Sequence, residues 1–302
     1  MSRGAYSAII LAGGDGTRLQ PLTRALTGDG RPKQFCALLG EDTLLDQTRR
    51  RVRMLVDPAR TLTVVTQAHE RYYRTALAGV PPSLVVEQPD NRGTAPAIVY
   101  ALLRLSAIAP DDPVALFPSD HYFSDDRIFM WNVEQALETV EVRPNLTVLL
   151  GIAADRPEVE YGWIEPGDVV AGVSAPVYNV RRFWEKPERG TAERLFAMGC
   201  FWNSFVFVAQ PATLLALVEA AATALVHGFG PLRASLTTPW EASAARALYA
   251  ALASTDFSRT VLTPSASRLA VVPVTGVDWN DLGDPGRVGI VRQRLDRQVA
   301  LA

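Results

Sequence analysis

Short apolar runs alternate with helix-length segments through the first half of the chain. The runs are apolar throughout, as in strands buried on both faces, and polar turns bound each of them. Strands are expected at 8–12, 61–66, 83–86, 114–117 and 146–150, and helices at 44–56, 95–108 and 128–140. Continuous apolar strands separated by helices predict an α/β fold with a parallel sheet covered on both faces.

The second half of the chain has a more mixed pattern. Strands are expected at 161–164, 177–184, 201–208 and 269–274, and helices at 211–227 and 240–254. The first of these helices has a proline at its start and Gly228 just past its end, which is a typical helix boundary pattern. Because no linker, repeat or low-complexity tract divides the chain, residues 1–302 are expected to form one domain.

A glycine-rich turn follows the first apolar run directly. Gly13, Gly14 and Gly16 lack a Cβ, so their backbone N–H groups can approach an anion closely. Ligands of parallel sheets bind at the carboxyl ends of the strands, where this turn is expected. Arg18 and Lys33 add two cations nearby, so the region is interpreted as a polyphosphate site.

Two common phosphate motifs do not fit this turn. A Walker loop needs Gly-Lys-Ser/Thr, and here Gly16 is followed by Thr17 and Arg18. A dinucleotide-binding fingerprint needs a further glycine, and Leu19 occupies its place.

Composition narrows the class of protein. Thirty basic and 32 acidic residues give a net charge of −2, so no strong field favours nucleic acid or a membrane surface. The two cysteines have no metal or redox spacing, which fits a reducing cytosol. The N-terminus has no secretory pattern, and the longest apolar window, 214–226, is too short to span a bilayer. We expect a cytoplasmic protein that binds neither nucleic acid nor membrane.

One run of arginines, at positions 49–51 and 53, falls on an expected helix. It could be a patch for nucleic acid or phosphate, but the near-neutral net charge favours a solvated helix face. On that face Asp46 is placed to pair with Arg50 at i, i+4.

The glycine turn and the segment after it resemble a known family. Gly-Gly-Asp-Gly-Thr-Arg-Leu-Gln-Pro-Leu-Thr at 13–23 and Pro-Lys-Gln-Phe at 32–35 are similar to the signature of the sugar-phosphate nucleotidyltransferases. The Gln-Phe pair points to the mannose-1-phosphate guanylyltransferases among them. The resemblance extends from residue 8 to about 285. It implies a Rossmann-like mixed, mostly parallel sheet flanked by helices, and a homodimer. The C-terminal β-helix or isomerase domain of some members is not expected.

The resemblance implies a Mg²⁺ site built from two acids. Asp120 stands in Pro-Ser-Asp-His, which is similar to the family's Pro-Ala-Asp-His, and Asp281 stands in Trp-Asn-Asp-Leu-Gly, which is similar to Trp-Ser-Asp-Val-Gly. Mg²⁺ prefers one or two carboxylates plus phosphate oxygens. His121 either orients Asp120 or has a structural role. The residues after Asp281 depart from the family pattern, so the edge of this site is expected to differ.

The resemblance also implies a site for the sugar phosphate. Glu185 and Lys186 stand in Phe-Trp-Glu-Lys-Pro, where the lysine would bind the phosphate and the glutamate the sugar hydroxyls. Gly162, in Tyr-Gly-Trp-Ile, would let the sugar approach the backbone, and Asn203, in Trp-Asn-Ser, would hydrogen-bond it. Phe205 replaces a glycine of the family. The neighbouring tryptophans 163 and 202 are expected in the core.

The base pocket is the part of the site where the motif is ambiguous. Gly93 stands where related guanylyltransferases have asparagine, and in thymidylyltransferases Gln88 and this glycine would read the base. Thr94 or Asp90 could instead cap the following helix. The rest of the pattern favours guanine. The resemblance assigns nucleotide binding to Gly13, Gly14, Gly16, Thr17, Arg18, Lys33, Gln88, Gly93 and Thr94.

The implied reaction joins mannose 1-phosphate and GTP to give GDP-mannose and pyrophosphate. Its nucleophile is a phosphate oxygen that is already anionic, so cations, Mg²⁺ and positioning matter more than a general base. The expected catalytic set is Arg18, Lys33, Asp120, Lys186 and Asp281. The alternatives are another nucleotide or hexose, such as dTTP and glucose 1-phosphate, or a catalytically silent regulatory relative. Because the chain retains all five charged groups, a catalytically silent relative is disfavoured.

Overall fold

The computed structural model describes residues 5–301, so residues 1–4 and 302 of the expected domain lie outside the described residues. The strands are β1 (Ser7–Leu11), β2 (Thr61–Thr66), β3 (Val85–Gln88), β4 (Val114–Pro118), β5 (Tyr122–Phe123), β6 (Thr147–Ala153), β7 (Gly162–Val169), β8 (Tyr178–Glu185), β9 (Phe201–Ala209), β10 (Leu269–Val274) and β11 (Trp279–Asn280). The helices are α1 (Gln20–Thr27), α2 (Leu44–Val52), α3 (Glu70–Ala76), α4 (Thr94–Ile108), α5 (Asp126–Val142), α6 (Arg189–Ala197), α7 (Pro211–Ala221), α8 (Thr223–Gly228), α9 (Gly230–Ser235), α10 (Glu241–Ala251) and α11 (Pro285–Leu301).

A nine-stranded sheet in the order β3-β2-β1-β4-β9-β6-β10-β8-β7 runs through the molecule. The half formed by β3, β2, β1 and β4 is parallel, as expected from the alternation of strands and helices. In the other half only β6 and β10 pair in parallel, so the expectation of a mostly parallel sheet is wrong and the sheet is mixed. β7 and β8 are antiparallel because the connection at 170–177 is too short for a crossover helix.

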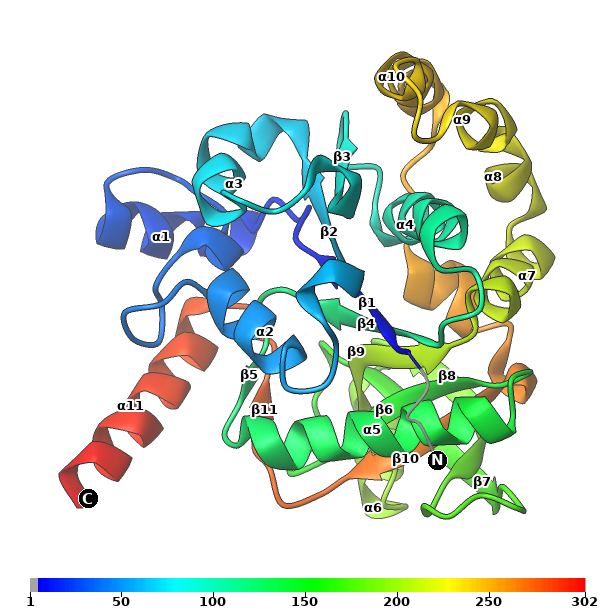
Figure 1. Ribbon diagram of the computed structural model, residues 1–302. Coiled ribbons are helices and arrows are strands. Elements are labelled where there is room, and N and C mark those ends of the chain that lie inside the picture. Colours follow the sequence, from blue (N-terminus) through cyan, green and yellow to red (C-terminus); the bar gives the residue numbers. More distant parts are fainter. Residues whose placement is uncertain (1–4, 302) are drawn as a thin grey trace.

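Each face of the sheet carries its own hydrophobic core. Along β1, Ala8 and Ile10 belong to the core that contains α2, α3 and α5, whereas Ile9 belongs to the core under α4 and α7–α10. Figure 1 shows these two groups of helices on opposite sides of the strands, with α11 projecting from the molecule at the C-terminal end. A strand that is buried on both faces therefore accounts for the continuous apolar run.

One expected helix is divided in the structure, and an expected helix cap does not form. The helix expected at 211–227 is broken at Ala222, whose φ of −146° and ψ of 57° are not helical, so α7 and α8 are separate. Neither Asp90 nor Thr94 caps α4, since Gly93 is the N-cap residue and no side chain caps it.

No single described helix meets the length and apolarity needed to cross a bilayer, although the bent pair of 211–221 and 223–235 meets them together.

The arginine run on α2 is not a uniformly solvated face. Arg51 is 2% exposed, and its Nε donates a hydrogen bond of 2.5 Å to Oδ1 of Asp126 at the start of α5. Arg50 is exposed and pairs with Asp42, 2.6 Å away, so the expected pairing with Asp46 is wrong. Arg51 therefore ties α2 to α5 from inside the molecule.

Replacing Arg51 by alanine should lower the free energy of unfolding by about 3 kcal/mol, because Asp126 would lose its partner in a partly buried place. Arg50→Ala is the matched control, and it should cost less than about 1 kcal/mol because its ion pair is exposed. Urea unfolding of both variants tests this. Equal losses for the two would contradict a buried ion pair at Arg51.

Candidate active site

A cleft of about 490 Å³ opens where β1, β3 and β4 end. Most of the residues expected in the site line it, although they come from elements far apart in the sequence. They are Gly13, Gly14, Arg18, Gln88, Gly93, Thr94, Asp120, Gly162, Glu185, Lys186, Asn203 and Asp281. Gly16, Thr17 and Lys33 do not line the cleft; Gly16 lies against the backbone of Lys33, and Thr17 begins the short helix that carries Arg18.

The glycine turn is held in shape by hydrogen bonds from below. Nε2 of Gln34, which is 1% exposed, donates to the carbonyls of Ala12 at 2.9 Å and Gly14 at 2.8 Å. The Thr66 hydroxyl donates to the carbonyl of Gly13 at 2.8 Å. These bonds occupy the carbonyls, while no acceptor among the described residues takes a hydrogen bond from the N–H groups of the turn, which suits an anion. The glutamine of Pro-Lys-Gln-Phe thus has a structural task beside the turn.

Pairing of β5 with β11 brings the two acids to the same cleft. β4 leads into Asp120 and then into β5, while Asp281 directly follows β11. The ammonium group of Lys33 lies between them: its Nζ is 3.4 Å from Oδ2 of Asp120 and donates to the backbone carbonyl of Asp281 at 2.5 Å. A second bond from Nζ reaches the carbonyl of Leu282 at 3.1 Å.

Arg287, on the first turn of α11, is a contact that the sequence pattern did not reveal. It is 7% exposed, and its guanidinium lies 2.9 Å from Oδ1 of Asp281 and 3.2 Å from Oε2 of Glu158. Burial would raise the pKa of the Asp281 carboxyl, but opposing charges, that of Arg287 foremost, hold it below its ordinary value. The expectation that the edge of the site after Asp281 differs from the family stays a prediction, and the contact of Arg287 was not part of it.

The two carboxylates fit a hard divalent cation such as Mg²⁺. Both line the cleft, and the remaining oxygen ligands would come from phosphate and water, which is how Mg²⁺ is commonly held. No cluster of three or more metal-binding side chains occurs within residues 5–297. Burial lowers the pKa of His121 to about 4, which leaves this neighbour of Asp120 neutral. Its Nδ1 accepts a hydrogen bond of 3.3 Å from Nε1 of Trp279.

The strand pairing of β7, β8 and β9 builds the opposite wall. Gly162 pairs with Glu185 across β7 and β8, and an added Cβ at Gly162 would lie 3.3 Å from the Cβ of Asn203. Burial, followed by the charge of nearby Asp256, raises the pKa of Glu185. Lys186 follows directly on the strand and is exposed in the cleft.

Two residues of this wall have backbone conformations that L-residues rarely adopt. The φ angle is 48° at Lys186 and 58° at Phe205. The left-handed conformation at Phe205 explains why the related motif has a glycine there. Non-glycine residues in this region cluster at functional sites, where the surrounding structure holds them in place. The Phe205 side chain lines the cleft, so it narrows the space that a glycine would leave.

An unpredicted segment, 254–258, closes the cleft beside the start of α4. Its Thr255 accepts a hydrogen bond from the N–H of Ala95 and donates one to the carbonyl of Arg92. The N–H of Phe257 donates to the Thr94 hydroxyl at 2.8 Å. This docking explains Gly93: its φ of 84° and ψ of −179° are accessible essentially to glycine alone, and an added Cβ would lie 2.5 Å from the Thr255 carbonyl oxygen.

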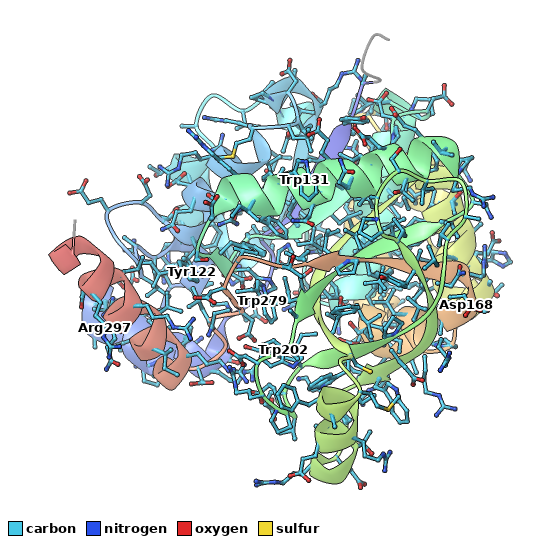
Figure 2. All side chains as sticks on the ribbon, turned by 90° about the horizontal axis from the view of Figure 1, so that it is seen from below. Tyr122, Trp131, Asp168, Trp202, Trp279 and Arg297 are labelled. Atoms are coloured by element: carbon cyan, nitrogen blue, oxygen red, sulfur yellow. The ribbon has the colours of Figure 1, made fainter. Side chains whose placement is uncertain are left out.

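Aromatic rings pack beneath the acids. The rings of Tyr161 and Trp279 are 4.8 Å apart, and those of Trp202 and Trp279 are 6.4 Å apart. Figure 2 shows Trp202 and Trp279 close together in the interior, whereas Trp131 lies on α5. Trp163 and Trp202 are 0% and 2% exposed, which confirms the core packing expected for both.

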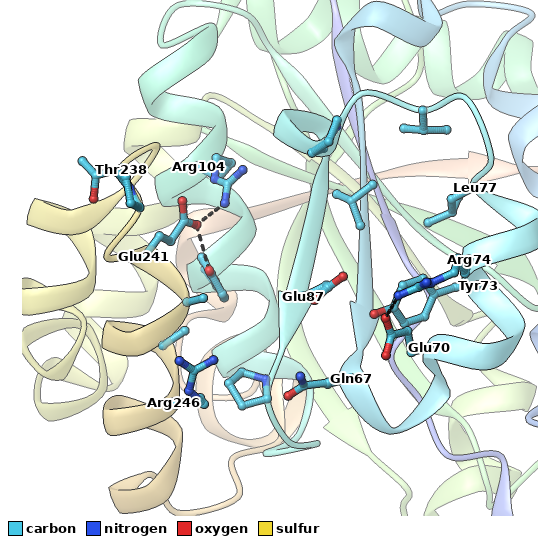
Figure 3. Close-up of a pocket in the computed structure, with 18 residues that line it drawn as sticks. Gln67, Glu70, Tyr73, Arg74, Leu77, Glu87, Arg104, Thr238, Glu241 and Arg246 are labelled. Carbon is cyan, nitrogen blue, oxygen red and sulfur yellow. Dashed lines mark hydrogen bonds and ion pairs between the residues drawn. The ribbon is translucent and has the colours of Figure 1, made fainter.

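A second cavity, of about 500 Å³, lies at the β3 edge of the sheet between α3 and α10. Figure 3 shows Glu241 reaching Arg104 and Glu70 lying beside Arg74, and both are ion pairs. Its charged groups are therefore largely neutralised by each other. None of the site residues expected from the sequence lines this cavity.

The comparison with known families agrees with this geometry. Residues 7–223 match the Nucleotidyl transferase family, and the chain belongs to it. Among curated proteins, the chain is 34% identical to "Alginate biosynthesis protein AlgA" of Pseudomonas aeruginosa over 66% of its own length and 40% of that protein. It is 33% identical to "Mannose-1-phosphate guanylyltransferase" of Escherichia coli K12 over 69% of its length and 43% of that protein. The chain thus spans about two fifths of the length of these relatives.

A solved structure is similar over most of the chain. The crystal structure described as mannose-1-phosphate geranyltransferase from Thermus thermophilus has a TM-score of 0.79 and 30% sequence identity. The similarity covers 92% of this chain and 76% of that one. The fold therefore includes the segments after residue 223, which the family match does not cover.

Gly93→Ala should lower the free energy of unfolding by about 1–3 kcal/mol, because the Cβ would strain the backbone and push segment 254–258 from the start of α4. Gly190→Ala is the matched control: it has open space in helix α6, so it should be neutral or stabilising by up to about 1 kcal/mol. Thermal and urea unfolding measure both. Wild-type stability in Gly93→Ala would contradict the tight docking of Thr255.

Proposed function

We propose that this chain transfers GMP from GTP to mannose 1-phosphate, giving GDP-mannose and pyrophosphate. The observation that carries the proposal is the cleft itself, where exposed cations from opposite walls, Arg18 and Lys186, face two acids at the ends of β4 and β11. Two anionic substrates repel each other, so an enzyme that joins them has to supply cations and fixed positions.

At the nucleotide end, the free N–H groups of the glycine turn would bind the triphosphate. Arg18, which is 61% exposed at its side chain and 3.5 Å from Glu160, is free to move onto the β- and γ-phosphates. Lys33 would leave its contact with Asp120 and stabilise the negative charge of the same phosphates from beneath the cleft. Gln88, Gly93 and Thr94 would surround the base.

At the sugar end, Lys186 would hold the phosphate of mannose 1-phosphate, while Glu185, Asn203 and Gly162 would surround the hydroxyls. A phosphate oxygen forms a bond to the α-phosphorus as the bond from that phosphorus to the bridging oxygen of pyrophosphate breaks. The attacking oxygen is already anionic, so no side chain needs to remove a proton.

Asp120 and Asp281 would hold Mg²⁺, which neutralises charge on the phosphates when bound. Arg287 would keep Asp281 ionised and oriented through the 2.9 Å contact. His121, held by Trp279, would limit the movement of Asp120.

We also propose that residues 1–302 form one nucleotidyltransferase domain, which the continuous nine-stranded sheet supports. The homodimer and the cytoplasmic location stay predictions. A second candidate keeps the chemistry and changes the base, because Gln88 beside Gly93 also fits a thymidylyltransferase pattern.

Pyrophosphate release across a grid of nucleoside triphosphates and hexose 1-phosphates tests the proposal. GTP with mannose 1-phosphate should give the highest kcat/KM, at least about tenfold above the other pairs, and removal of Mg²⁺ by a chelator should abolish it. Asp120→Asn, purified in the same way, controls for contaminating activity. A preference for dTTP would favour the second candidate, and no release with any pair would favour a catalytically silent relative.

Lys186→Ala should raise KM for the sugar phosphate at least about tenfold, since a charge-assisted contact is lost, with KM for the nucleotide changed less than about twofold. Arg189→Ala removes a nearby cation that is 87% exposed at its side chain and pairs with Glu193, so it should leave both KM values unchanged. An effect confined to the nucleotide KM would show that Lys186 contacts the nucleotide and not the sugar phosphate.

A further inference from the structure

A buried tyrosine contacts the residue expected to read the base. Tyr249 lies on α10 and is 0% exposed, and its hydroxyl donates a hydrogen bond of 3.1 Å to Oε1 of Gln88. Gln88 ends β3, is 2% exposed and lines the cleft. The two residues are 161 positions apart, so no local motif joins them.

The hydrogen bonds of this glutamine are asymmetric. Oε1 accepts from Tyr249, while no side chain or carbonyl within residues 5–297 accepts a hydrogen bond from Nε2. Nε2 lies against the glycine turn, where a Cβ added to Gly13 would come within 2.6 Å of it. The amide thus presents two unused N–H donors beside the turn expected to bind phosphates.

The tyrosine favours this orientation over the reverse one. Burial raises the pKa of Tyr249 above its ordinary range, so the hydroxyl keeps its proton. If the amide turned over, Nε2 would face the hydroxyl, and the buried hydroxyl proton would lose its acceptor, since Gln88 is its partner among the described residues. The geometry therefore fixes which end of the amide faces the cleft.

We propose that Tyr249 is a positioning residue that sets base selectivity by orienting the Gln88 amide. An N–H group donates a hydrogen bond to an oxo oxygen on the base, whereas an amino group at the same place is itself a donor and cannot accept that bond. The site should therefore prefer a 6-oxopurine or a 4-oxopyrimidine to its amino counterpart. This inference rests on the proposed function only in that the cleft binds a nucleotide.

A second buried tyrosine supplies the matched control. Tyr100 packs in the same cluster, with its ring 6.4 Å from that of Tyr249, but its hydroxyl donates to Glu241 at 2.8 Å. Tyr100→Phe and Tyr249→Phe each remove one buried hydroxyl and keep the ring. Only Tyr249→Phe removes the hydrogen bond to the Gln88 amide.

The test compares GTP with 2,6-diaminopurine riboside triphosphate, which carries an amino group in place of the 6-oxo group. Wild-type protein should favour GTP, and Tyr249→Phe should lower the ratio of the two kcat/KM values about tenfold, the effect of one hydrogen bond. The kcat for GTP should change less than about twofold. Tyr100→Phe should leave the ratio as it is. An unchanged ratio in Tyr249→Phe, or an equal fall in Tyr100→Phe, would overturn the proposal.

Gln88→Glu gives a second measure that does not depend on packing. Its carboxylate still accepts from Tyr249 but turns an acceptor to the cleft, so preference should shift toward the diaminopurine nucleotide. A retained preference for GTP would overturn the proposal.

Calorimetric binding of the same nucleotides separates this inference from the proposed function. Should the wild-type protein turn over dTTP instead of GTP, dTTP and 5-methyl-dCTP replace the purine pair. Should it turn over no substrate, the proposed reaction fails, while a tighter Kd for the oxo nucleotide that weakens in Tyr249→Phe supports the orientation of Gln88. Equal Kd values for the oxo and amino forms would overturn it.

Discussion

The ammonium group of Lys33 joins three segments that are far apart in the chain. It contacts the carboxylate of Asp120 and the backbone carbonyls of Asp281 and Leu282. The short antiparallel pair of β5 and β11 holds the same segments together from the other side. Because these contacts set where the two acids stand, the shape of the cleft depends on them.

Around this point the charges are arranged in pairs that can be exchanged. Asp120 faces Lys33, Asp281 faces Arg287, and Arg18 faces Glu160. In the proposed reaction, anionic substrates and a divalent cation would take over several of these partners. The ion pair of Arg51 and Asp126 lies outside these pairs and ties α2 to α5.

The sequence predicted the site where motif residues sit directly at the ends of strands. The glycine turn and Asp120 follow from local patterns, because the carboxyl ends of the parallel strands β1 and β4 meet at one edge. Glu185 ends an antiparallel strand and was expected from the resemblance. The parallel half of the sheet was predictable for the same reason. The antiparallel half was missed, since apolar runs do not encode strand direction.

The residues that were missed come from segments placed by tertiary contacts. Segment 254–258 reaches the start of α4 after six intervening helices, and the sign of it in the sequence was the unusual glycine at 93. Arg287 and Tyr249 donate hydrogen bonds to Asp281 and Gln88, and neither has a local pattern that distinguishes it from an ordinary helix residue. The positions of these residues depend on packing and hydrogen bonds between helices that are far apart in the sequence.

The most direct measurement is a crystal structure of the protein with GDP-mannose and Mg²⁺. The account predicts that the diphosphate lies between the glycine turn and Lys186, with Asp120 and Asp281 on one ion and the mannose against Glu185 and Asn203. A sugar nucleotide bound elsewhere, such as the cavity between α3 and α10, would contradict it. So would a diphosphate out of reach of Lys186 or an ion that touches neither acid.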